Sequence, residues 1–197
     1  MAQRKSATPQ ATEGSGRLRI IGGTWRGRKL NFSAAPGLRP TPDRVRETVF
    51  NWLAPQIHQA WCADLFAGSG ALGLEALSRG AAHCDFVDSN GQTMVQIQQH
   101  LAALSALSQA KCINDKAASF LQSTKTRYDI VFIDPPFGMG LTAEVCDLLA
   151  SRCLLNPGAL IYLETGTSDE APDIPLSWRL HREKTSGEVH FRLYQLD

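Results

Sequence analysis

The sequence alternates short apolar runs with stretches whose apolar residues recur at helical spacing, beginning at Trp61. Parallel strands need a crossover of about a dozen residues or more, usually a helix, so this alternation favours an α/β fold around a mostly parallel sheet. The run YDIVFI at 128–133 is the clearest buried strand. We expect strands at 61–66, 83–87, 111–113, 128–133 and 159–164, helices at 71–78, 93–104, 117–122 and 141–153, a turn at 156–158, and a closing hairpin of 178–184 and 189–196 joined at 185–187.

The first 54 residues differ from this pattern. Residues 1–16 are small and polar, which predicts a disordered tail. Residues 17–54 predict a basic extension, made of a β-hairpin over 17–30 with Gly22-Gly23 between its arms and a helix with Asp43 as its N-cap. Residues 55–197 are then expected to form the main domain.

Charge is unevenly distributed, although the formal net charge is only +1. Residues 1–50 hold ten Lys or Arg against three Asp or Glu, whereas the rest of the chain holds ten against sixteen. A chain polarised in this way presents a basic surface that attracts polyanions. A solvated, flexible terminus is the alternative explanation of the same charges.

The cysteines and histidines argue against a metal site or a disulfide framework. The five cysteines include no C-x-x-C pair, and the five histidines are scattered. Free cysteine inside apolar strands behaves as a small hydrophobe, which fits a reducing cytosol. No run approaches the roughly 20 apolar residues of a membrane span, and no signal peptide follows Met1. We therefore expect a cytoplasmic protein without a metal ion.

A glycine-rich turn separates the first strand of the main domain from its first helix. Gly68 permits a tight turn, Gly70 lets a ligand approach the backbone, and Gly73 allows helix and strand to pack closely. The second strand ends at Asp88, twenty residues beyond Gly68. A carboxylate at that spacing is placed to bind the hydroxyls of a ribose, so the turn predicts a nucleotide-like cofactor.

The turn alone fits either a dinucleotide or S-adenosylmethionine. Asp64, at the end of the first strand, suits a cationic methionine ammonium and would repel a pyrophosphate. Asp115 closes the third strand, where it would either accept from an adenine amino group or cap the next helix. The decision between the cofactors rests on the fourth strand.

The fourth strand runs directly into Asp134-Pro135-Pro136-Phe137. The two prolines cannot continue a central strand, so they predict a rigid loop at the carboxyl end of the sheet. The Asp134 carboxylate and a proline carbonyl would both accept from the exocyclic amino group of a base, holding its nitrogen in line with a methyl sulfonium. Phe137 offers a face on which a flipped-out base stacks.

The DPPF loop and the turn from Asp64 to Gly70 together resemble the class I S-adenosylmethionine-dependent methyltransferases that modify exocyclic amines. The segments RLRIIGGTWRGRKL at 17–30, RPTPDRVRE at 39–47 and FNWL at 50–53 are similar to the RsmD family, bacterial methyltransferases of small-subunit ribosomal RNA. The resemblance covers the chain from Arg17 to its end. It implies a Rossmann-like, mostly parallel seven-stranded sheet with a C-terminal antiparallel hairpin, preceded by a small hairpin and helix.

The resemblance also implies an activity: methylation of the exocyclic N2 of guanine 966 in 16S ribosomal RNA, by a monomer acting on the small subunit or an assembly intermediate. Asp88 would hold the ribose of S-adenosylmethionine, and Asp115 its adenine. The residues assigned to the cofactor are Asp64, Phe66, Gly68, Gly70, Asp88, Asp115 and Asp134, and those assigned to catalysis are Asp134, Pro135 and Phe137.

The basic hairpin is expected to contact RNA phosphates. The residues assigned to this surface are Arg17, Arg19, Trp25, Arg26, Arg28 and Lys29. Trp25 would either stack on a base or brace the hairpin. Arg39, Thr41 and Arg44 would contact RNA, contact the cofactor or cover its pocket, and the sequence does not separate these roles.

Three other functions share part of this pattern. A DNA adenine-N6 methyltransferase uses the same Asp-Pro-Pro-aromatic chemistry, but it generally needs a separate target-recognition domain for which this chain has no room. An NAD-dependent oxidoreductase is disfavoured by Asp64 and the two prolines. An inactive RNA-binding assembly factor would keep the fold, yet nothing is visibly missing from the predicted site.

Overall fold

The computed structural model describes residues 15–33 and 41–197. The strands are β1 (Ser15–Arg19), β2 (Lys29–Ser33), β3 (Trp61–Asp64), β4 (His83–Asp88), β5 (Ala110–Asn114), β6 (Tyr128–Ile133), β7 (Leu155–Gly166), β8 (Trp178–Ser186) and β9 (Val189–Leu196). The helices are α1 (Asp43–Leu53), α2 (Ala71–Ser78), α3 (Gly91–Ala103), α4 (Ala117–Ser123) and α5 (Leu141–Ser151), with a short 3-10 turn at Leu107–Gln109. The predicted tail at 1–16 lies almost wholly outside the described residues, as does Arg39.

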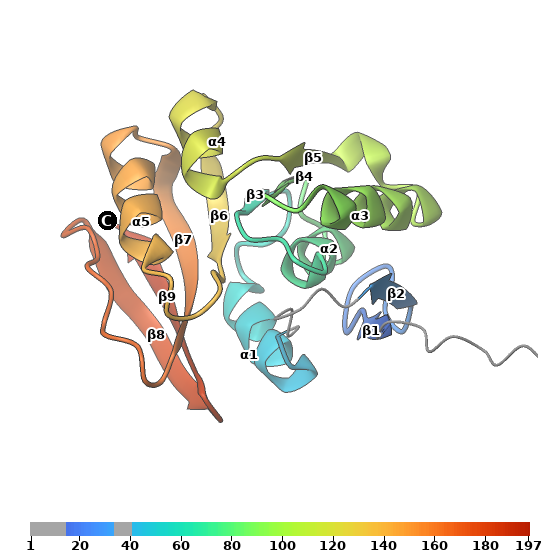
Figure 1. Ribbon diagram of the computed structural model, residues 1–197, viewed down its shortest axis with the longest axis horizontal. Helices are drawn as coiled ribbons and strands as arrows, with labels where there is room; N and C mark the ends of the chain where they lie inside the picture. Colours follow the sequence, from blue (N-terminus) through green and yellow to red (C-terminus); the bar gives the residue numbers. More distant parts are fainter. Residues whose placement is uncertain (1–14, 34–40) are drawn as a thin grey trace, which may run out of the picture.

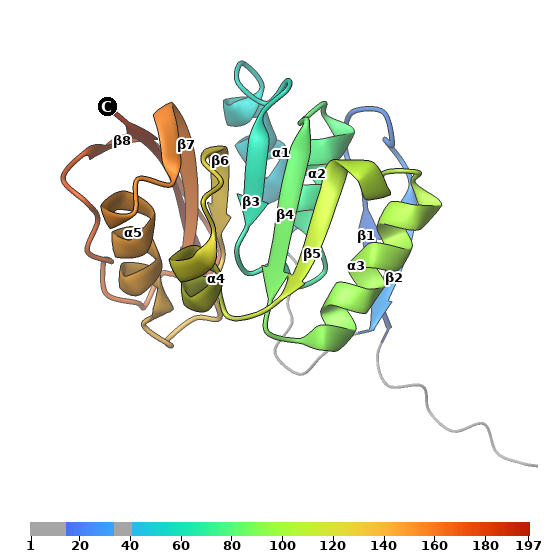
Figure 2. The same ribbon diagram turned by 90° about the horizontal axis from the view of Figure 1, so that it is seen from above.

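Seven strands form one sheet in the order β5-β4-β3-β6-β7-β9-β8 (Figure 2). The first five are parallel, and β9 inserts antiparallel between β7 and β8. This is the predicted α/β architecture with its C-terminal antiparallel hairpin. The strand order reverses direction between β3 and β6, and open α/β sheets bind ligands at such a point, outside the carboxyl ends of the strands.

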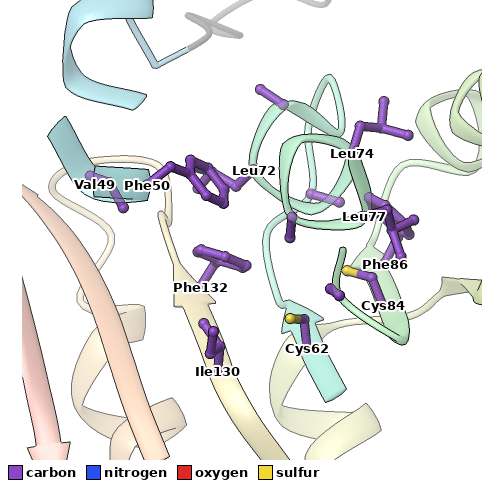
Figure 3. Close-up of a cluster of buried hydrophobic side chains, with 14 of the residues drawn as sticks. Val49, Phe50, Cys62, Leu72, Leu74, Leu77, Cys84, Phe86, Ile130 and Phe132 are labelled. Carbon is purple, nitrogen blue, oxygen red and sulfur yellow. The ribbon is translucent and has the colours of Figure 1, made fainter. Parts of the chain in front are cut away.

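Helices cover both faces of the sheet (Figure 1). One face packs against α1, α2 and α3, and the other packs against α4 and α5. Figure 3 shows the first of these cores, where Phe50 of α1 lies over Phe132 of β6 with 5.8 Å between ring centroids. Cys62 and Cys84 lie in the same core, and burial raises the pKa of both thiols, so neither is a reactive thiolate at neutral pH.

The N-terminal strands β1 and β2 form the predicted antiparallel hairpin. Leu18 lies opposite Leu30, and both are buried in the core shared with α2 and α3, whereas Arg17 and Lys29 point outward. Gly22-Gly23 lies between the two arms, as predicted, within a connection that runs from residue 20 to residue 28. Gly23 is needed there for contact: it has φ of +75°, and a Cβ atom would lie 1.8 Å from the carbonyl oxygen of Ser78.

A buried ion cluster fixes this connection to helix α2. The Glu75 carboxylate accepts from the backbone N–H groups of Ile21 and Gly22 at 2.8 Å each. It also accepts from Arg79 at 2.8 Å and lies 3.5 Å from the buried guanidinium of Arg46 on α1. Helix α1, the hairpin connection and α2 are therefore joined through one carboxylate.

Two local predictions need correction. Pro42, rather than Asp43, is the N-cap of α1. The Asp43 carboxylate forms ion pairs with the guanidinium groups of Arg46 and Arg19, so it does not cap the helix. The predicted turn at 156–158 falls inside β7, as an irregularity in its pairing with β6. Of the helices in the described ranges, none is long and apolar enough to cross a membrane.

Candidate active site

Five parallel strands bring an acidic side chain to the same edge of the sheet. Asp115, Asp88, Asp64, Asp134 and Glu164 stand at or next to the carboxyl ends of β5, β4, β3, β6 and β7, in that spatial order. The loops that follow these strands lie together at this edge (Figure 2). In the described part of the chain, no group of three or more His, Cys, Asp or Glu is arranged to hold a metal ion.

The glycine turn between β3 and α2 is held by β4. The backbone N–H of Gly68 donates to the Asp88 carboxylate at 2.9 Å, and the other carboxylate oxygen accepts from Asn90 at 2.8 Å. Gly68 and Gly70 have φ values of +49° and +76°, which explains the need for glycine. Close packing at Gly73 is confirmed, because a Cβ atom there would lie 2.2 Å from the ring of Phe86.

Asp64 supports this turn from inside the protein. Its buried carboxylate accepts from the backbone N–H of Gly73 at 2.9 Å. Burial, reinforced by the negative charges of Asp88 and Glu164, raises the pKa of Asp64 to about 7, against the hydrogen bond from Gly73. Asp64 therefore fixes the start of α2 and also contributes negative potential beneath the predicted cofactor site.

Asp115 and Phe66 follow strands β5 and β3 at this edge. The backbone N–H of Asp115 donates to the carbonyl of Asp88 at 3.2 Å, so these two acids are neighbours. Lys116 is the N-cap of α4, and Asp115 precedes it, so the capping alternative is not what the structure adopts. Phe66 is half-buried and packs against the core on the α4 and α5 side.

The DPPF loop begins at the end of β6, as predicted. Asp134 is half-buried and Pro135 is buried, whereas the Phe137 side chain is 46% exposed. Gly138 and Gly140 follow with positive φ values of +74° and +65°. The loop therefore has a fixed base at the sheet and presents its aromatic ring to solvent.

Thr41 connects the N-terminal extension to this loop. Its buried hydroxyl donates to the Asp134 carboxylate at 3.2 Å. The sequence left the role of Thr41 open, and the structure places it at the predicted catalytic acid. Arg44 lies exposed on α1.

Glu164 on β7 was not predicted from the sequence. Its side chain is 2% exposed, and its carboxylate accepts from the hydroxyl of Tyr162 at 2.6 Å. Burial raises the pKa of Glu164, although the hydroxyls of Tyr162 and Thr41 oppose that rise. The sequence signal was present, because Glu164 ends an apolar strand that follows the DPPF strand in the chain.

The residues predicted to bind RNA divide into two groups. Arg17, Arg19 and Lys29 are exposed along the hairpin, and Arg19 pairs with Asp43. Trp25, Arg26 and Arg28 lie on the connection at the opposite edge of the sheet from the DPPF loop. The backbone N–H of Trp25 donates to Ser78 at the end of α2, eight residues and about 12 Å from the glycine turn.

The Trp25 side chain contacts the body of the domain, and whether it also stacks on RNA stays a prediction. Its half-buried indole packs against the core and lines a cavity of about 430 Å³ together with Leu77 and Ser105. Arg28 donates to the carbonyl of Ala103 at 3.4 Å.

Comparison with known proteins identifies the family. The family model described as "Conserved hypothetical protein 95" matches residues 18–195. Ribosomal RNA small subunit methyltransferase D of Escherichia coli strain K12 is 53% identical over 182 residues, covering 92% of this chain and 91% of that protein. This chain belongs to the RsmD family. The Haemophilus influenzae protein of the same name is 46% identical over 195 residues, covering 98% and 99%.

A solved structure supports this membership. A putative methyltransferase from Escherichia coli superposes with a TM-score of 0.86 at 49% identity, covering 92% of this chain and 99% of that one. The resemblance to the RsmD family and the predicted fold class are thus confirmed. As a member of this family, the chain is an S-adenosylmethionine-dependent methyltransferase.

The site has the charge that this cofactor requires. S-adenosylmethionine carries cationic sulfonium and ammonium groups, and the edge of the sheet offers Asp64, Asp88 and Asp134 as acceptors. Among the residues in the described ranges, Asp64, Asp134 and Glu164 form no ion pair with Lys, Arg or His. An edge with uncompensated carboxyls suits a cation and disfavours the pyrophosphate of a dinucleotide.

Proposed function

We propose that this chain methylates the exocyclic N2 of guanine 966 in bacterial 16S ribosomal RNA, on the small subunit or an assembly intermediate. The names of the relatives from Escherichia coli and Haemophilus influenzae support a small-subunit RNA substrate. The observation that carries the proposal for the chemistry is the position of Asp134 and Phe137: one anchored carboxyl and one exposed ring at the switch point of the sheet.

The DPPF loop would recognise an amino group on a flipped-out base. The Asp134 carboxylate, which already accepts from Thr41, and the carbonyl of Pro135 would both accept from that group, and the two prolines add no N–H donor to the loop. An exocyclic amino group has two N–H donors, so two acceptors fix the direction of its nitrogen. Phe137 would stack on the ring of the base, a contact that contributes roughly 1–3 kcal/mol.

The chain's own residues would supply orientation and proton acceptance. S-adenosylmethionine, when bound, supplies the electrophilic methyl group. Guanine N2 is a weak nucleophile because its lone pair is delocalised into the ring, so holding it in line is a large part of catalysis. The Asp134 carboxylate would stabilise the positive charge that develops on this nitrogen.

The cofactor would bind along the acidic edge. Asp88 would hold the ribose hydroxyls while it keeps the N–H of Gly68, Asp115 would accept from the adenine amino group, and Asp64 would favour the cationic methionine end. The remaining assigned positions are Phe66, Gly68, Gly70 and Asp134.

The basic extension would bind RNA on two sides of the domain. Arg17, Arg19 and Lys29 would contact phosphates along the hairpin. Arg26 and Arg28 belong to the connection that contacts the far end of α2, so the length of this helix separates them from the glycine turn. They would therefore contact nucleotides distant from the methylated guanine. Such contacts add affinity and position the RNA without reading its bases.

A methyl-transfer assay with three substrates tests this proposal. Tritium from labelled S-adenosylmethionine is followed into small subunits lacking this modification, into naked 16S RNA and into duplex DNA, and the modified nucleoside is identified. We expect N2-methylguanosine at position 966 in the subunits. N6-methyladenine in DNA would support the competing DNA function, and no incorporation into any substrate would support the inactive assembly factor.

A further inference from the structure

Asp134 and Glu164 lie side by side on neighbouring strands. Strands β6 and β7 are parallel, and their register pairs Ile133 with Leu163, so the next residues along the two strands are Asp134 and Glu164. Neighbouring strands are about 4.8 Å apart. Side chains alternate between faces, and Phe132 and Tyr162 belong to the core beneath α1 and α2, so both carboxyls point to that same face.

Two hydroxyl groups hold this pair. Tyr162 donates to Glu164 at 2.6 Å, and Thr41 donates to Asp134 at 3.2 Å. The Thr41 hydroxyl also lies within reach of Glu164. A hydroxyl has one proton and donates to one acceptor at a time, so Thr41 cannot satisfy both carboxylates if both are ionised.

The surroundings of the pair add negative charge. Asp64 on β3 interacts electrostatically with both Asp134 and Glu164. The polar groups that contact the pair are the hydroxyl of Tyr162, on β7, and the hydroxyl of Thr41, in the segment before α1. On β9, Glu164 is paired with Phe191, which is apolar. Within the described ranges, no Lys, Arg or His forms an ion pair with any of the three carboxyls.

We propose that Glu164 is a positioning residue that acts through Asp134: it stays ionised against Tyr162, and its charge keeps a proton on Asp134 in the free protein. This inference rests on the proposed function for its consequence. When a cationic cofactor occupies the edge, Asp134 releases that proton to solvent and becomes an acceptor for the target amino group. The neighbouring negative charge makes ionised Asp134 a stronger base than an isolated aspartate.

Asp134 then takes up the proton that methyl transfer releases. The bond from nitrogen to methyl carbon forms as the sulfur–methyl bond breaks, and the sulfur keeps that electron pair. The nitrogen loses one N–H proton to Asp134, and the N–H electrons remain on nitrogen. Asp134 is thereby returned to the protonated form it has in the free protein.

The electrostatic environment supports this order of protonation. Burial, with the negative charges of Glu164 and Asp64, raises the pKa of Asp134 well above its usual range, and within residues 15–33 and 41–197 it is the Thr41 hydroxyl that opposes that rise. Glu164 accepts the shorter bond, 2.6 Å from Tyr162 against 3.2 Å from Thr41 to Asp134, which favours Glu164 as the ionised member of the pair.

The test is a titration of the cofactor-free protein with isotope-labelled side-chain carboxyl carbons, followed by NMR. Asp134→Asn assigns the Asp134 signal. We expect Asp134 to titrate well above the value of about 3.9 for a free aspartate, and Glu164→Gln to lower its midpoint by about one pH unit or more. Thr41→Val, which keeps the shape of the side chain, should raise the midpoint, and Thr41→Ser should leave it near that of the parent.

Matched controls separate this effect from general electrostatics. Glu144→Gln removes an exposed charge on α5 and should leave the Asp134 midpoint unchanged. An Asp134 signal that titrates near 4 in the parent, or one that does not move in both Glu164→Gln and Thr41→Val, would overturn the proposal. If Glu164→Gln does not fold, Thr41→Val decides alone.

The pH profile of methyl transfer provides the second readout. With Glu164→Gln, the acid limb of the profile should move to lower pH by the same amount as the midpoint, and the plateau rate should fall because the base is weaker. Failure of this inference can be told apart from failure of the proposed function, because the titration of Asp134 is carried out without RNA. Methylation of guanine with an ordinary Asp134 midpoint would overturn this inference alone, whereas a raised midpoint without RNA methylation would overturn only the function.

Discussion

Two buried acidic clusters lie on the same face of this sheet, and they differ in whether positively charged groups pair with their carboxylates. Glu75 on α2 is surrounded by donors: two backbone N–H groups, Arg79 and the buried guanidinium of Arg46. In the described part of the chain, Asp64, Asp134 and Glu164 accept from hydroxyl groups and one backbone N–H, and none of them forms an ion pair with Lys, Arg or His. Burial of a carboxylate is costly unless it is paired, so the first cluster stabilises the fold and the second retains unbalanced charge.

The comparison indicates where chemistry takes place. The compensated cluster joins three segments of the chain. The uncompensated cluster lies at the switch point, where a cationic ligand would balance its charge. Changes at the second cluster should therefore alter activity and pH dependence, and changes at the first should alter stability.

The largest expected effect is on catalysis at Asp134. Asp134→Ala removes the acceptor for the target amino group, and we expect methyl transfer to fall by about 10³-fold or more. The rate is measured at saturating S-adenosylmethionine, so that a change in cofactor affinity does not enter the comparison. Asp147→Ala, an exposed acid on α5, is the control and should keep the parent rate. An unchanged rate in Asp134→Ala would remove the catalytic assignment.

The next effect is on stability at Glu75. Glu75→Gln removes the buried counter-charge that Arg46 and Arg79 share, leaving Arg46 paired with Asp43, and we expect a loss of about 3–5 kcal/mol in the free energy of unfolding. Denaturant titration measures this. Glu47→Gln, exposed on α1, should change stability by less than about 0.5 kcal/mol. Equal stability of both variants would mean that the Glu75 cluster does not hold the hairpin.

A smaller effect concerns the pH dependence of stability. The pKa of Asp64 is raised to about 7 in the folded protein, so the folded state binds its proton more tightly than the unfolded chain. Stability from this group is present below about pH 4 and is lost as the pH rises toward 7. Asp64→Asn should flatten this decline by about 1–4 kcal/mol between pH 5 and pH 8. An unaltered decline would show that Asp64 titrates normally.

The smallest effect is on RNA binding by the hairpin connection. Arg26→Ala with Arg28→Ala should weaken binding to the small subunit and lower the slope of log affinity against log salt by roughly two. The rate at saturating substrate should stay near that of the parent. Arg182→Ala with Lys184→Ala, both exposed on β8, is the matched control. A slope equal to that of the control would exclude the connection from the RNA surface.

Local patterns in the sequence predicted the elements well. Helix α2 and strand β6 have the predicted bounds, because a glycine turn and an unbroken apolar run are signals contained in a few residues. The mostly parallel sheet followed from the alternation of elements, whereas the order of its strands was not predicted. The acids at the ends of β3, β4 and β6 were found because each belongs to a motif of known spacing.

Contacts between distant segments were not predictable in the same way. Thr41 and Asp134 are 93 residues apart, and Ile21 and Glu75 are 54 apart, so no local spacing reports them. Glu164 has no motif of its own, and only the register of β6 and β7 places it beside Asp134. Asp43 has a residue type typical of an N-cap, but tertiary ion pairs occupy its carboxylate instead.

The comparison between the clusters is tested most directly by unfolding Glu164→Gln and Glu75→Gln side by side in denaturant at pH 8. Each substitution removes one buried negative charge and keeps the shape of the side chain. We expect Glu164→Gln to be as stable as the parent or more stable, because it removes a buried charge that repels Asp64 and that no cation in the described ranges balances, while Glu75→Gln loses several kcal/mol. Equal destabilisation of the two variants would contradict the assignment of one cluster to structure and the other to chemistry.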